Sequence, residues 1–360
     1  MKKIDKDKIH NILAIRTDRI GRIGCSARYY GLGEALLNIP AIRALKQNFN
    51  SSIVVLANPV VRELLAGSPE IDQILTFDED KWNKSISTRL RLLWQIRKGK
   101  YDLAVVFNPT KRFHILTYLA GIPRRLGYTR KWGFLLTHKI EDKKSLGQKH
   151  EVEYNLDLVR SVGADTDKKN ISITVEKKDT RFVGDLLLKY AITAQDLIIA
   201  IHPHSSNPAK SWPRENFASV ADELRSRFAA KVAIIGAAQE RNSVIDLISL
   251  TKYPPINLSG ELTLKQLAAF FQRCALVISN DSGPVHIAVA MGTPTVVIFG
   301  RNIPGVSPKR WGPWGNGHIV LHKDAGCNPC LDRKCPYNFK CLTSITPEEV
   351  LKAVERQLRT

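Results

Sequence analysis

Short runs of consecutive apolar residues alternate with amphipathic segments along the first half of the chain. Three such runs, at residues 12–15, 53–56 and 103–107, are each interpreted as a buried strand. Helices are expected between and after them, at residues 35–47, 60–66, 87–98 and 115–121. Strands that are apolar on both faces and separated by helices are typical of a parallel sheet. The first half is therefore predicted to be a Rossmann-like α/β domain.

The same alternation restarts after a break close to residue 175. Charged and small residues fill the segments 165–170 and 176–179, which places the domain boundary there. Further strands are expected at residues 197–201, 232–235, 276–279 and 295–299. Further helices are expected at residues 214–228, 241–249, 264–274 and 284–291. The predicted organisation is two Rossmann-like domains, 1–175 and 176–345, and a final segment, 346–360, that forms a helix over 347–358.

The composition is that of an ordinary globular protein, but the charge is unusual. The chain has 360 residues, more than a single hydrophobic core usually organises, and 44% of them are apolar. The 54 Lys and Arg residues outnumber the 34 Asp and Glu residues, so the net charge is +20. A positive field of this size favours anionic partners, which include nucleic acid, an anionic membrane surface and phosphorylated small molecules. Charge alone does not choose among them.

No stretch of the chain approaches the roughly 18 apolar residues that a membrane-spanning helix needs. The first eight residues are mostly charged and lead directly towards the first expected strand, without the apolar core of a signal peptide. The sequence therefore predicts a soluble cytoplasmic protein.

The clearest local motif joins the strand at 276–279 to the helix at 284–291. Its linking residues are Asn280 to Pro284, with Gly283 immediately before a proline that suits the first helical position. Backbone N–H groups at such a helix start form a ready site for an anion such as phosphate. Simple capping of the helix by Asp281 or Ser282 would produce much the same residues, so this motif by itself leaves both interpretations open.

Polar residues also follow two neighbouring strands. Lys210 lies on the loop after strand 197–201, where it could neutralise a departing diphosphate, and Ser205 or Ser206 could bond the phosphate oxygens. Glu240 follows strand 232–235, at a position where carboxylates often hold ribose hydroxyls. The alternatives are a solvated lysine and an exposed acid at a helix start. Because ligands bind outside the carboxyl ends of such strands, we expect these residues to lie at one edge of the sheet.

These three segments, in this order and spacing, resemble the C-terminal domain of the lipopolysaccharide heptosyltransferases, glycosyltransferase family 9. The resemblance extends to residues 38–45 and to the tail over 327–350. It implies two Rossmann-like domains that face each other across a cleft (the GT-B fold), with the final helix packed back on the first domain. It also implies an inverting, metal-independent transfer of heptose from ADP-heptose, with no required cofactor. The implied acceptor is a lipopolysaccharide inner-core or related glycolipid.

The resemblance also assigns residues to the donor. It implies that Lys210 holds the diphosphate and that Glu240 holds the ribose. The residues that it places at the phosphate and sugar end of the donor are Asp281, Ser282, Gly283 and His286.

The first loop departs from the pattern of the family, which has a short basic segment, a glycine and an acid, and then a proline six residues after the acid. Here twelve extra residues, 22–33, stand before Glu34, and Pro40 follows Glu34 by six. Glu34 thus occupies the position of the catalytic base, which takes the proton from the acceptor hydroxyl. Asp18 is the second candidate base. Glu34 could instead simply favour the positive N-terminus of the next helix.

The insertion also keeps other functions open. One is a catalytically impaired or regulatory homologue that binds sugar nucleotides, because a base displaced by ~1 Å can lose about a hundredfold in rate. Another is a transferase that uses a different nucleotide-sugar.

Four cysteines crowd into the tail with the spacing C-x2-C-x4-C-x5-C: Cys327, Cys330, Cys335 and Cys341. Four thiolates could hold zinc or an iron–sulfur cluster, although the spacing fits no zinc ribbon well. Free thiols or disulfides are the alternative. The resemblance implies a local staple of the loop before the last helix.

Basic pairs gather in the expected acceptor domain. The residues predicted to contact the acceptor are Lys111, Arg112, Arg124 and Arg125, and further pairs stand at 130–131 and 143–144. A phosphorylated glycolipid explains them, and it places the enzyme at the inner face of the cytoplasmic membrane as a peripheral protein. A generally solvated basic face is the alternative. No RNA-binding or helix-turn-helix signature supports nucleic acid as a partner.

An acidic triplet, Asp78-Glu79-Asp80, sits in an expected N-terminal turn and raises a rival hypothesis. Many metal-dependent sugar transferases hold Mg²⁺ or Mn²⁺ through carboxylates at such a position. The anion site at the helix start could already neutralise the charge of a diphosphate, so the triplet is not assigned to the donor site.

Overall fold

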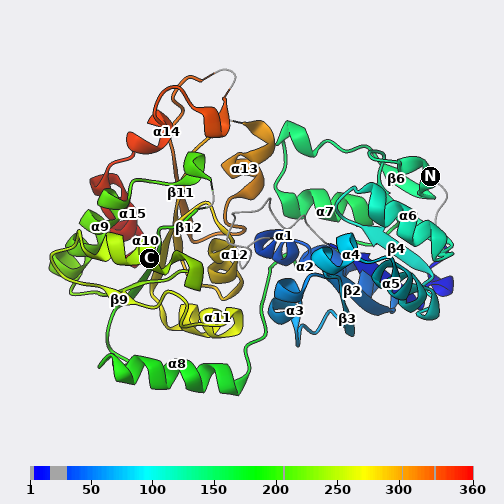
Figure 1. The fold of residues 1–360 in the computed structure, drawn as a ribbon, viewed down its shortest axis with the longest axis horizontal. Helices are drawn as coiled ribbons and strands as arrows, with labels where there is room; N and C mark the ends of the chain where they lie inside the picture. Colours follow the sequence, from blue (N-terminus) through cyan, green and yellow to red (C-terminus); the bar gives the residue numbers. More distant parts are fainter. Residues whose placement is uncertain (1–3, 17–30, 206, 302, 328–329, 360) are drawn as a thin grey trace. The chain divides into compact units, whose positions relative to one another are not determined.

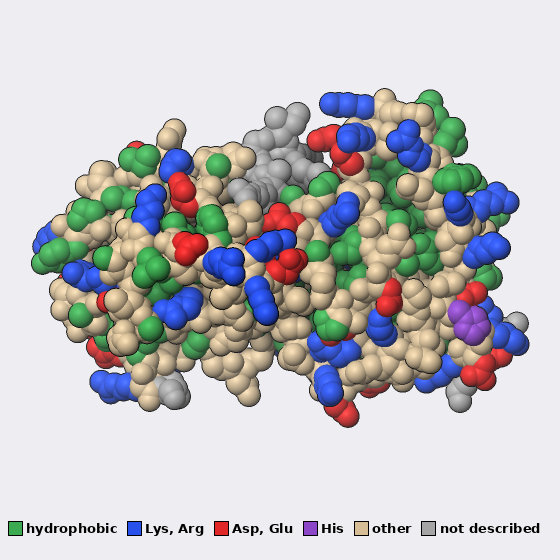
Figure 2. Space-filling model, turned by 90° about the horizontal axis from the view of Figure 1, so that it is seen from below, with side chains coloured by type: hydrophobic (Ala, Val, Ile, Leu, Met, Phe, Trp, Pro, Cys, Tyr) green, Lys and Arg blue, Asp and Glu red, His purple; other side chains and the backbone are tan. Residues whose placement is uncertain are grey.

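The computed structural model describes residues 4–16, 31–205, 207–301, 303–327 and 330–359. The chain forms two compact units, and the main division falls between Ile171 and Ser172, close to the expected boundary at residue 175. Each unit contains one six-stranded sheet in which all paired strands run parallel (Figure 1). Basic side chains are spread over both units on the face drawn in Figure 2.

The N-terminal sheet has the order β3-β2-β1-β4-β5-β6. Its strands are β1 (Asn11–Ile15), β2 (Ser52–Ala57), β3 (Gln73–Thr76), β4 (Leu103–Val106), β5 (Arg124–Tyr128) and β6 (His138–Ile140). Its helices are α1 (Leu32–Leu36), α2 (Ile39–Phe49), α3 (Pro59–Leu65), α4 (Glu79–Lys84), α5 (Ile86–Lys98), α6 (Lys111–Leu119) and α7 (Glu151–Arg160), with short 3-10 turns η1 (Lys6–Lys8), η3 (Gly133–Leu135) and η4 (Lys144–Leu146).

The N-terminal core follows from the alternation of side chains along the strands. Leu13 and Ile15 of β1 point to the same face of the sheet and pack with Leu92 and Ile96 of α5. The intervening residues of β1 are buried as well, because helices cover both faces. This double burial is why β1 reads as a continuous apolar run.

The C-terminal sheet has the order β12-β11-β10-β7-β8-β9. Its strands are β7 (Ile198–His202), β8 (Lys231–Ile234), β9 (Ile256–Asn257), β10 (Leu276–Asn280), β11 (Thr295–Phe299) and β12 (His318–His322). Its helices are α8 (Lys177–Lys189), α9 (Arg214–Phe228), α10 (Arg241–Ile248), α11 (Leu264–Arg273), α12 (Gly283–Ala290), α13 (Pro308–Trp311), α14 (Lys340–Thr343) and α15 (Pro347–Leu358). Its 3-10 turns are η5 (Pro208–Lys210), η6 (Ala238–Glu240), η7 (Pro304–Val306) and η8 (Asp332–Lys334).

The final helix, α15, packs on the C-terminal sheet, and the expectation that it also packs back on the first domain stays a prediction. Its apolar face, which includes Val350 and Val354, is buried in the same core as Val296 and Ile298 of β11. The helix starts at a capping box in which the Thr346 hydroxyl accepts from the backbone of Glu349. Its apolar stripe is covered by α9 and the neighbouring strands β10, β11 and β12.

The predicted strands and helices are found, with ends that differ by a few residues. The strands that the sequence did not predict are β3, β5, β6, β9 and β12. They are short or only partly buried and contain polar residues, so they lack the apolar run that marked the central strands.

Candidate functional site

Three neighbouring strands of the C-terminal sheet end at one edge and bring the predicted donor residues together. β7 lies between β10 and β8, and the three strands are parallel. The loop after β7 crosses to the end of β10, where the Lys210 Nζ lies 2.7 Å from Asp281 Oδ2. The loop is fixed there by Asn280, whose side chain accepts from the Trp212 backbone N–H at 3.1 Å. The expectation that these segments meet is confirmed.

The start of α12 is not closed by the side chains that could cap it. The Ser282 side chain makes no cap hydrogen bond; its hydroxyl lies 3.0 Å from His202 Nδ1 and 3.0 Å from Ser279 Oγ. The Asp281 carboxylate is directed to Lys210 instead. The capping interpretation of this motif is therefore wrong, and the geometry fits the anion-site interpretation: a helix N-terminus at the sheet edge with a lysine beside it.

Arg301 also lies at this edge, although the sequence pattern did not predict it as a site residue. It follows β11 and is buried, with its Nη2 atom 3.3 Å from Asp281 Oδ2 and its backbone at a φ of 63°. Asp281 is thus shared between Lys210 and Arg301. The only available sequence signal was a basic residue directly after a buried strand and a glycine.

Arg301 and Lys210 differ in what they can reach. The Lys210 side chain is 26% exposed, whereas that of Arg301 is 9% exposed. Lys210 can therefore turn towards a ligand phosphate while Arg301 keeps the charge of Asp281 compensated.

Glu240 is buried, which contradicts the interpretation as an exposed acid. Its Oε2 atom accepts from the Ala237 backbone N–H at 2.8 Å, and its Oε1 atom lies 3.2 Å from His204 Nε2. Burial alone would raise the pKa of Glu240, but His202 and His204 outweigh it and lower the pKa below its ordinary value. The carboxylate therefore stays charged and holds the turn after β8. Its contact with ribose stays a prediction.

The other predicted donor residues have separate positions. The Ser205 hydroxyl bonds locally, to the backbone of Asn207. Gly283 is the first residue of α12, and His286 is buried in its first turn. Ser206 lies outside the described residues, and its contact with the phosphate stays a prediction.

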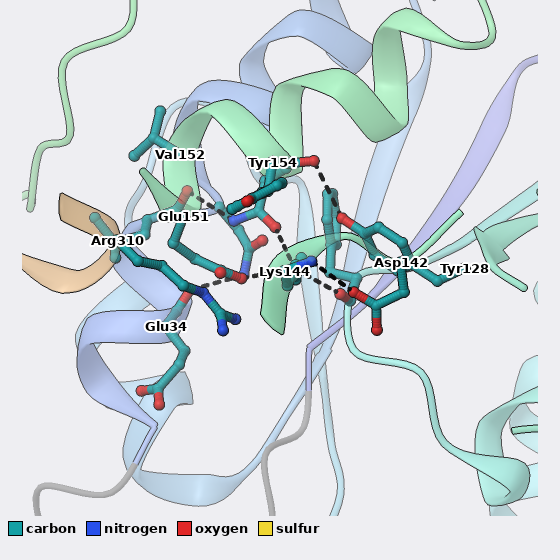
Figure 3. Close-up of polar contacts among 12 residues, drawn as sticks. Glu34, Tyr128, Asp142, Lys144, Glu151, Val152, Tyr154 and Arg310 are labelled. Atoms are coloured by element: carbon teal, nitrogen blue, oxygen red, sulfur yellow. Dashed lines mark hydrogen bonds and ion pairs between the residues drawn. The ribbon is translucent and has the colours of Figure 1, made fainter. Parts of the chain in front are cut away.

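Glu34, the predicted base, lies in the short helix α1 of the N-terminal unit. Its backbone carbonyl accepts from the Asn38 side chain at 2.7 Å, and Asn155 of α7 donates to the next segment, at Leu37 O, at 3.2 Å. Figure 3 shows the Glu34 carboxylate pointing away from Lys144. These two hydrogen bonds anchor the backbone around Glu34. Asp18, the second candidate base, lies outside the described residues.

Asn155, which donates to Leu37 O, is itself held by a buried ionic cluster. Lys144 Nζ lies 2.6 Å from Glu151 Oε1 and 3.2 Å from Asn155 Oδ1, and Arg16 Nη1 lies 3.5 Å from the same Glu151 atom (Figure 3 shows Lys144 and Glu151). Lys144 also stands 4.7 Å from the centre of the Tyr128 ring. All three charged side chains are at least nine-tenths buried. The lysine that the sequence placed in a basic surface pair is therefore part of the interior.

We expect Lys144→Met to lower the free energy of unfolding by about 3–5 kcal/mol, because it leaves the buried Glu151 carboxylate with a weakened set of partners. Chemical denaturation of the variant and the wild type would measure the difference. The double variant Lys144→Met/Glu151→Gln should recover part of the loss, since it removes the uncompensated charge. Equal stability of Lys144→Met and the exposed control Lys143→Met would contradict the prediction.

A family model described as glycosyltransferase family 9 (heptosyltransferase) matches residues 89–340. The chain belongs to this family. It is a glycosyltransferase. Lipooligosaccharide heptosyltransferase 2 of Campylobacter jejuni is 26% identical over 334 residues, which cover 90% of this chain and 96% of that protein.

Solved structures show the same fold as this family 9 chain. A family 9 glycosyltransferase from Veillonella parvula matches with a TM-score of 0.85 and 24% identity, over 99% of both chains. The Escherichia coli ADP-heptose lipopolysaccharide heptosyltransferase II matches with a TM-score of 0.76 and 22% identity, over 97% of this chain and 98% of that one. The two parallel sheets are therefore those of a GT-B glycosyltransferase.

The residues predicted to bind the acceptor of this family 9 enzyme do not form one group. Lys111 and Arg112 begin α6, just beyond the carboxyl end of β4. Arg124 and Arg125 stand at the start of β5, at the opposite edge of the parallel sheet. Arg125 also donates to the backbone carbonyls of Leu135 and Ile122, so its guanidinium shapes the fold. The contact of Lys111 and Arg112 with an acceptor stays a prediction.

The acidic triplet is used for local structure. Asp78 caps α4 by accepting from the Lys81 backbone N–H, and Glu79 pairs with Arg112 at 3.0 Å. The described residues include no group of three or more His, Cys, Asp or Glu side chains placed to hold a metal ion. Helix capping and ion pairing thus account for Asp78 and Glu79. In the same described portion, no helix is long and apolar enough to cross a membrane.

The four tail cysteines lie around one small pocket in the C-terminal unit. Arg301 and Asp332 line the same pocket, and Asp332 accepts from the Asn207 side chain at 3.0 Å. Desolvation and the neighbouring thiols raise the pKa of Cys327. The expected clustering of Cys327, Cys330, Cys335 and Cys341 is confirmed, next to the loop that carries Lys210. A bound metal and free thiols or disulfides both stay predictions.

Proposed function

We propose that this enzyme transfers a heptose from ADP-heptose to a glycolipid acceptor in lipopolysaccharide core synthesis, with inversion at the anomeric carbon. The names of the relatives support the sugar and the pathway, and the Escherichia coli structure is that of an ADP-heptose enzyme. The observation that carries the proposal is the junction of Lys210, Asp281 and the uncapped start of α12 at one sheet edge. This edge suits a diphosphate.

In the proposed reaction, Glu34 acts as the base, and Lys210 and the start of α12 stabilise the leaving group. Glu34 removes the proton from an acceptor hydroxyl, and the oxygen forms a bond with the anomeric carbon. The bond from that carbon to the diphosphate breaks, and ADP leaves with the electron pair. Lys210 and the N–H groups of α12 stabilise the negative charge that develops on the leaving phosphate. The proton ends on Glu34 and is released to solvent.

A thermal-shift comparison of nucleotide-sugars tests the donor. A ligand that binds only the folded protein stabilises it by about 2.7 kcal/mol at a hundred times its dissociation constant. We expect ADP-heptose to raise the melting temperature by several degrees, and UDP-sugars at the same concentration to leave it unchanged. A shift confined to UDP-sugars would redirect the proposal to another donor. Mass spectrometry of an acceptor incubated with ADP-heptose would then follow the transfer itself.

A further inference from the structure

Helix α5 presents an apolar stripe to solvent. Ile86, Leu90 and Trp94 are 71%, 60% and 60% exposed, and they follow one another at intervals of four residues. With about 3.6 residues per turn, such positions lie on one side of a helix. We call these three side chains the α5 stripe. Exposed apolar side chains that gather on one face of a helix point to a surface that binds a partner.

The opposite side of α5 already has its partners. Leu92 and Ile96 are buried in the N-terminal core, where they pack against residues of β1 and β4 such as Ile15 and Val106. The α5 stripe therefore does not contribute to the fold of the unit. Among the described residues of the N-terminal unit, none covers the α5 stripe.

Basic residues surround the α5 stripe. The thirteen residues of α5 contain no Asp or Glu and four Lys or Arg, all exposed. By helical position, Arg89 lies on one side of the stripe, Arg91 and Lys98 lie on the other, and Arg97 continues the stripe at its end. The Lys98 ammonium stands 5.0 Å from the centre of the Trp94 ring. An apolar stripe with Trp and flanking cations is the pattern of a helix that lies in a membrane interface.

Neighbouring elements extend this composition. Tyr118 and Leu119 of α6 and Trp132 and Phe134 near η3 are also exposed, and Lys111 stands 5.3 Å from the Trp132 ring centre. Both α5 and η3 contact α6. In the right half of Figure 2, which is the N-terminal unit, hydrophobic and basic side chains lie next to one another.

We propose that the α5 stripe and its flanking cations dock the enzyme on an anionic lipid bilayer. This inference rests on the proposed function, because a glycolipid acceptor is held in a bilayer. The charge of α5 decides the occupant: anionic headgroups complement its four cations. A second copy packed through the same helix would bring these cations opposite each other. Tyrosine and tryptophan rings with lysine or arginine beside them suit the boundary between headgroups and acyl chains.

Vesicle sedimentation of the full chain tests the proposal. We expect the wild type to bind phosphatidylcholine vesicles that contain phosphatidylglycerol at least tenfold more tightly than pure phosphatidylcholine vesicles. Leu90→Gln/Trp94→Gln should lose at least tenfold of this binding. Arg91→Gln/Lys98→Gln should lose binding as well and should show a weaker dependence on salt. The matched control is Leu188→Gln, since Leu188 is 72% exposed on α8 of the other unit, and it should bind as the wild type does.

Three results would overturn the proposal. The first is unchanged vesicle binding of Leu90→Gln/Trp94→Gln, and the second is an equal loss in Leu188→Gln. The third is light scattering that shows a wild-type dimer which Leu90→Gln/Trp94→Gln converts to monomer, because the stripe would then hold a second copy. The melting temperature and the shift with ADP-heptose should stay the same in all variants. If ADP-heptose gives no shift while vesicle binding behaves as expected, the proposed function fails and the docking surface stands.

Discussion

Glu34→Gln is expected to lower kcat by about 100- to 10,000-fold, the contribution typical of a general base. The amide keeps the size of the side chain but cannot accept the proton of the acceptor hydroxyl. Donor binding should be unchanged, because the predicted donor residues lie on the C-terminal sheet while Glu34 lies on α1. Steady-state kinetics with ADP-heptose, together with the thermal shift that ADP-heptose produces, would separate these two effects.

The helix-dipole alternative for Glu34 predicts a different outcome. An acid that only favours the N-terminus of a helix contributes about 0.3–1 kcal/mol to stability and nothing to chemistry. Glu348→Gln is a matched control, since Glu348 also lies in the first turn of a helix, α15. If Glu34→Gln loses a little stability, as Glu348→Gln does, and keeps its kcat, Glu34 is not the base. Asp18 would then be tested by Asp18→Asn.

Lys210→Met is expected to lower kcat by about 100- to 1,000-fold, as is typical when one group that stabilises developing charge is removed. The Lys210 Nζ lies 2.7 Å from Asp281 Oδ2, and a diphosphate that reaches the start of α12 would compete for the charge of the lysine. Lys210→Arg should recover part of the rate, because the charge returns with a different geometry. Kinetics and ADP-heptose titrations of the three proteins would measure both effects.

Lys210 could also serve only to pair Asp281. In that case Lys210→Met would be less stable and would keep its kcat, and Asp281→Asn would restore the stability of the double variant. Lys252→Met is the control for loss of an exposed positive charge elsewhere in the C-terminal unit. A normal kcat for Lys210→Met, with only a lower melting temperature, would remove Lys210 from the reaction.

The predicted donor residues at the carboxyl ends of β7, β8 and β10 could largely be placed from the sequence. Parallel strands that end in polar residues must meet at one sheet edge, so the meeting of Lys210 with Asp281 followed from the order of the elements. Arg301 was missed because its role depends on a positive φ and on burial against Asp281, and neither is visible in a linear pattern. The capping role of Asp78 and the burial of Glu240 depended in the same way on local backbone geometry.

Helix α5 shows the limit most clearly. Its apolar residues are spread around the helix, so the sequence identified a helix over 87–98 but did not tell which of them face inward. Only packing on the N-terminal sheet buries Leu92 and Ile96 and leaves the α5 stripe outside.

By itself, the sequence determined the two parallel α/β units and the edge at which the donor residues gather, because local apolar runs and strand order fix both. The tertiary structure decided the rest: α15 covers the C-terminal sheet, Lys144 is interior, and α5 keeps an exposed apolar stripe. These depend on which surfaces become neighbours after folding. When a helix is apolar on more than one side, residue type and spacing do not show which side will be buried.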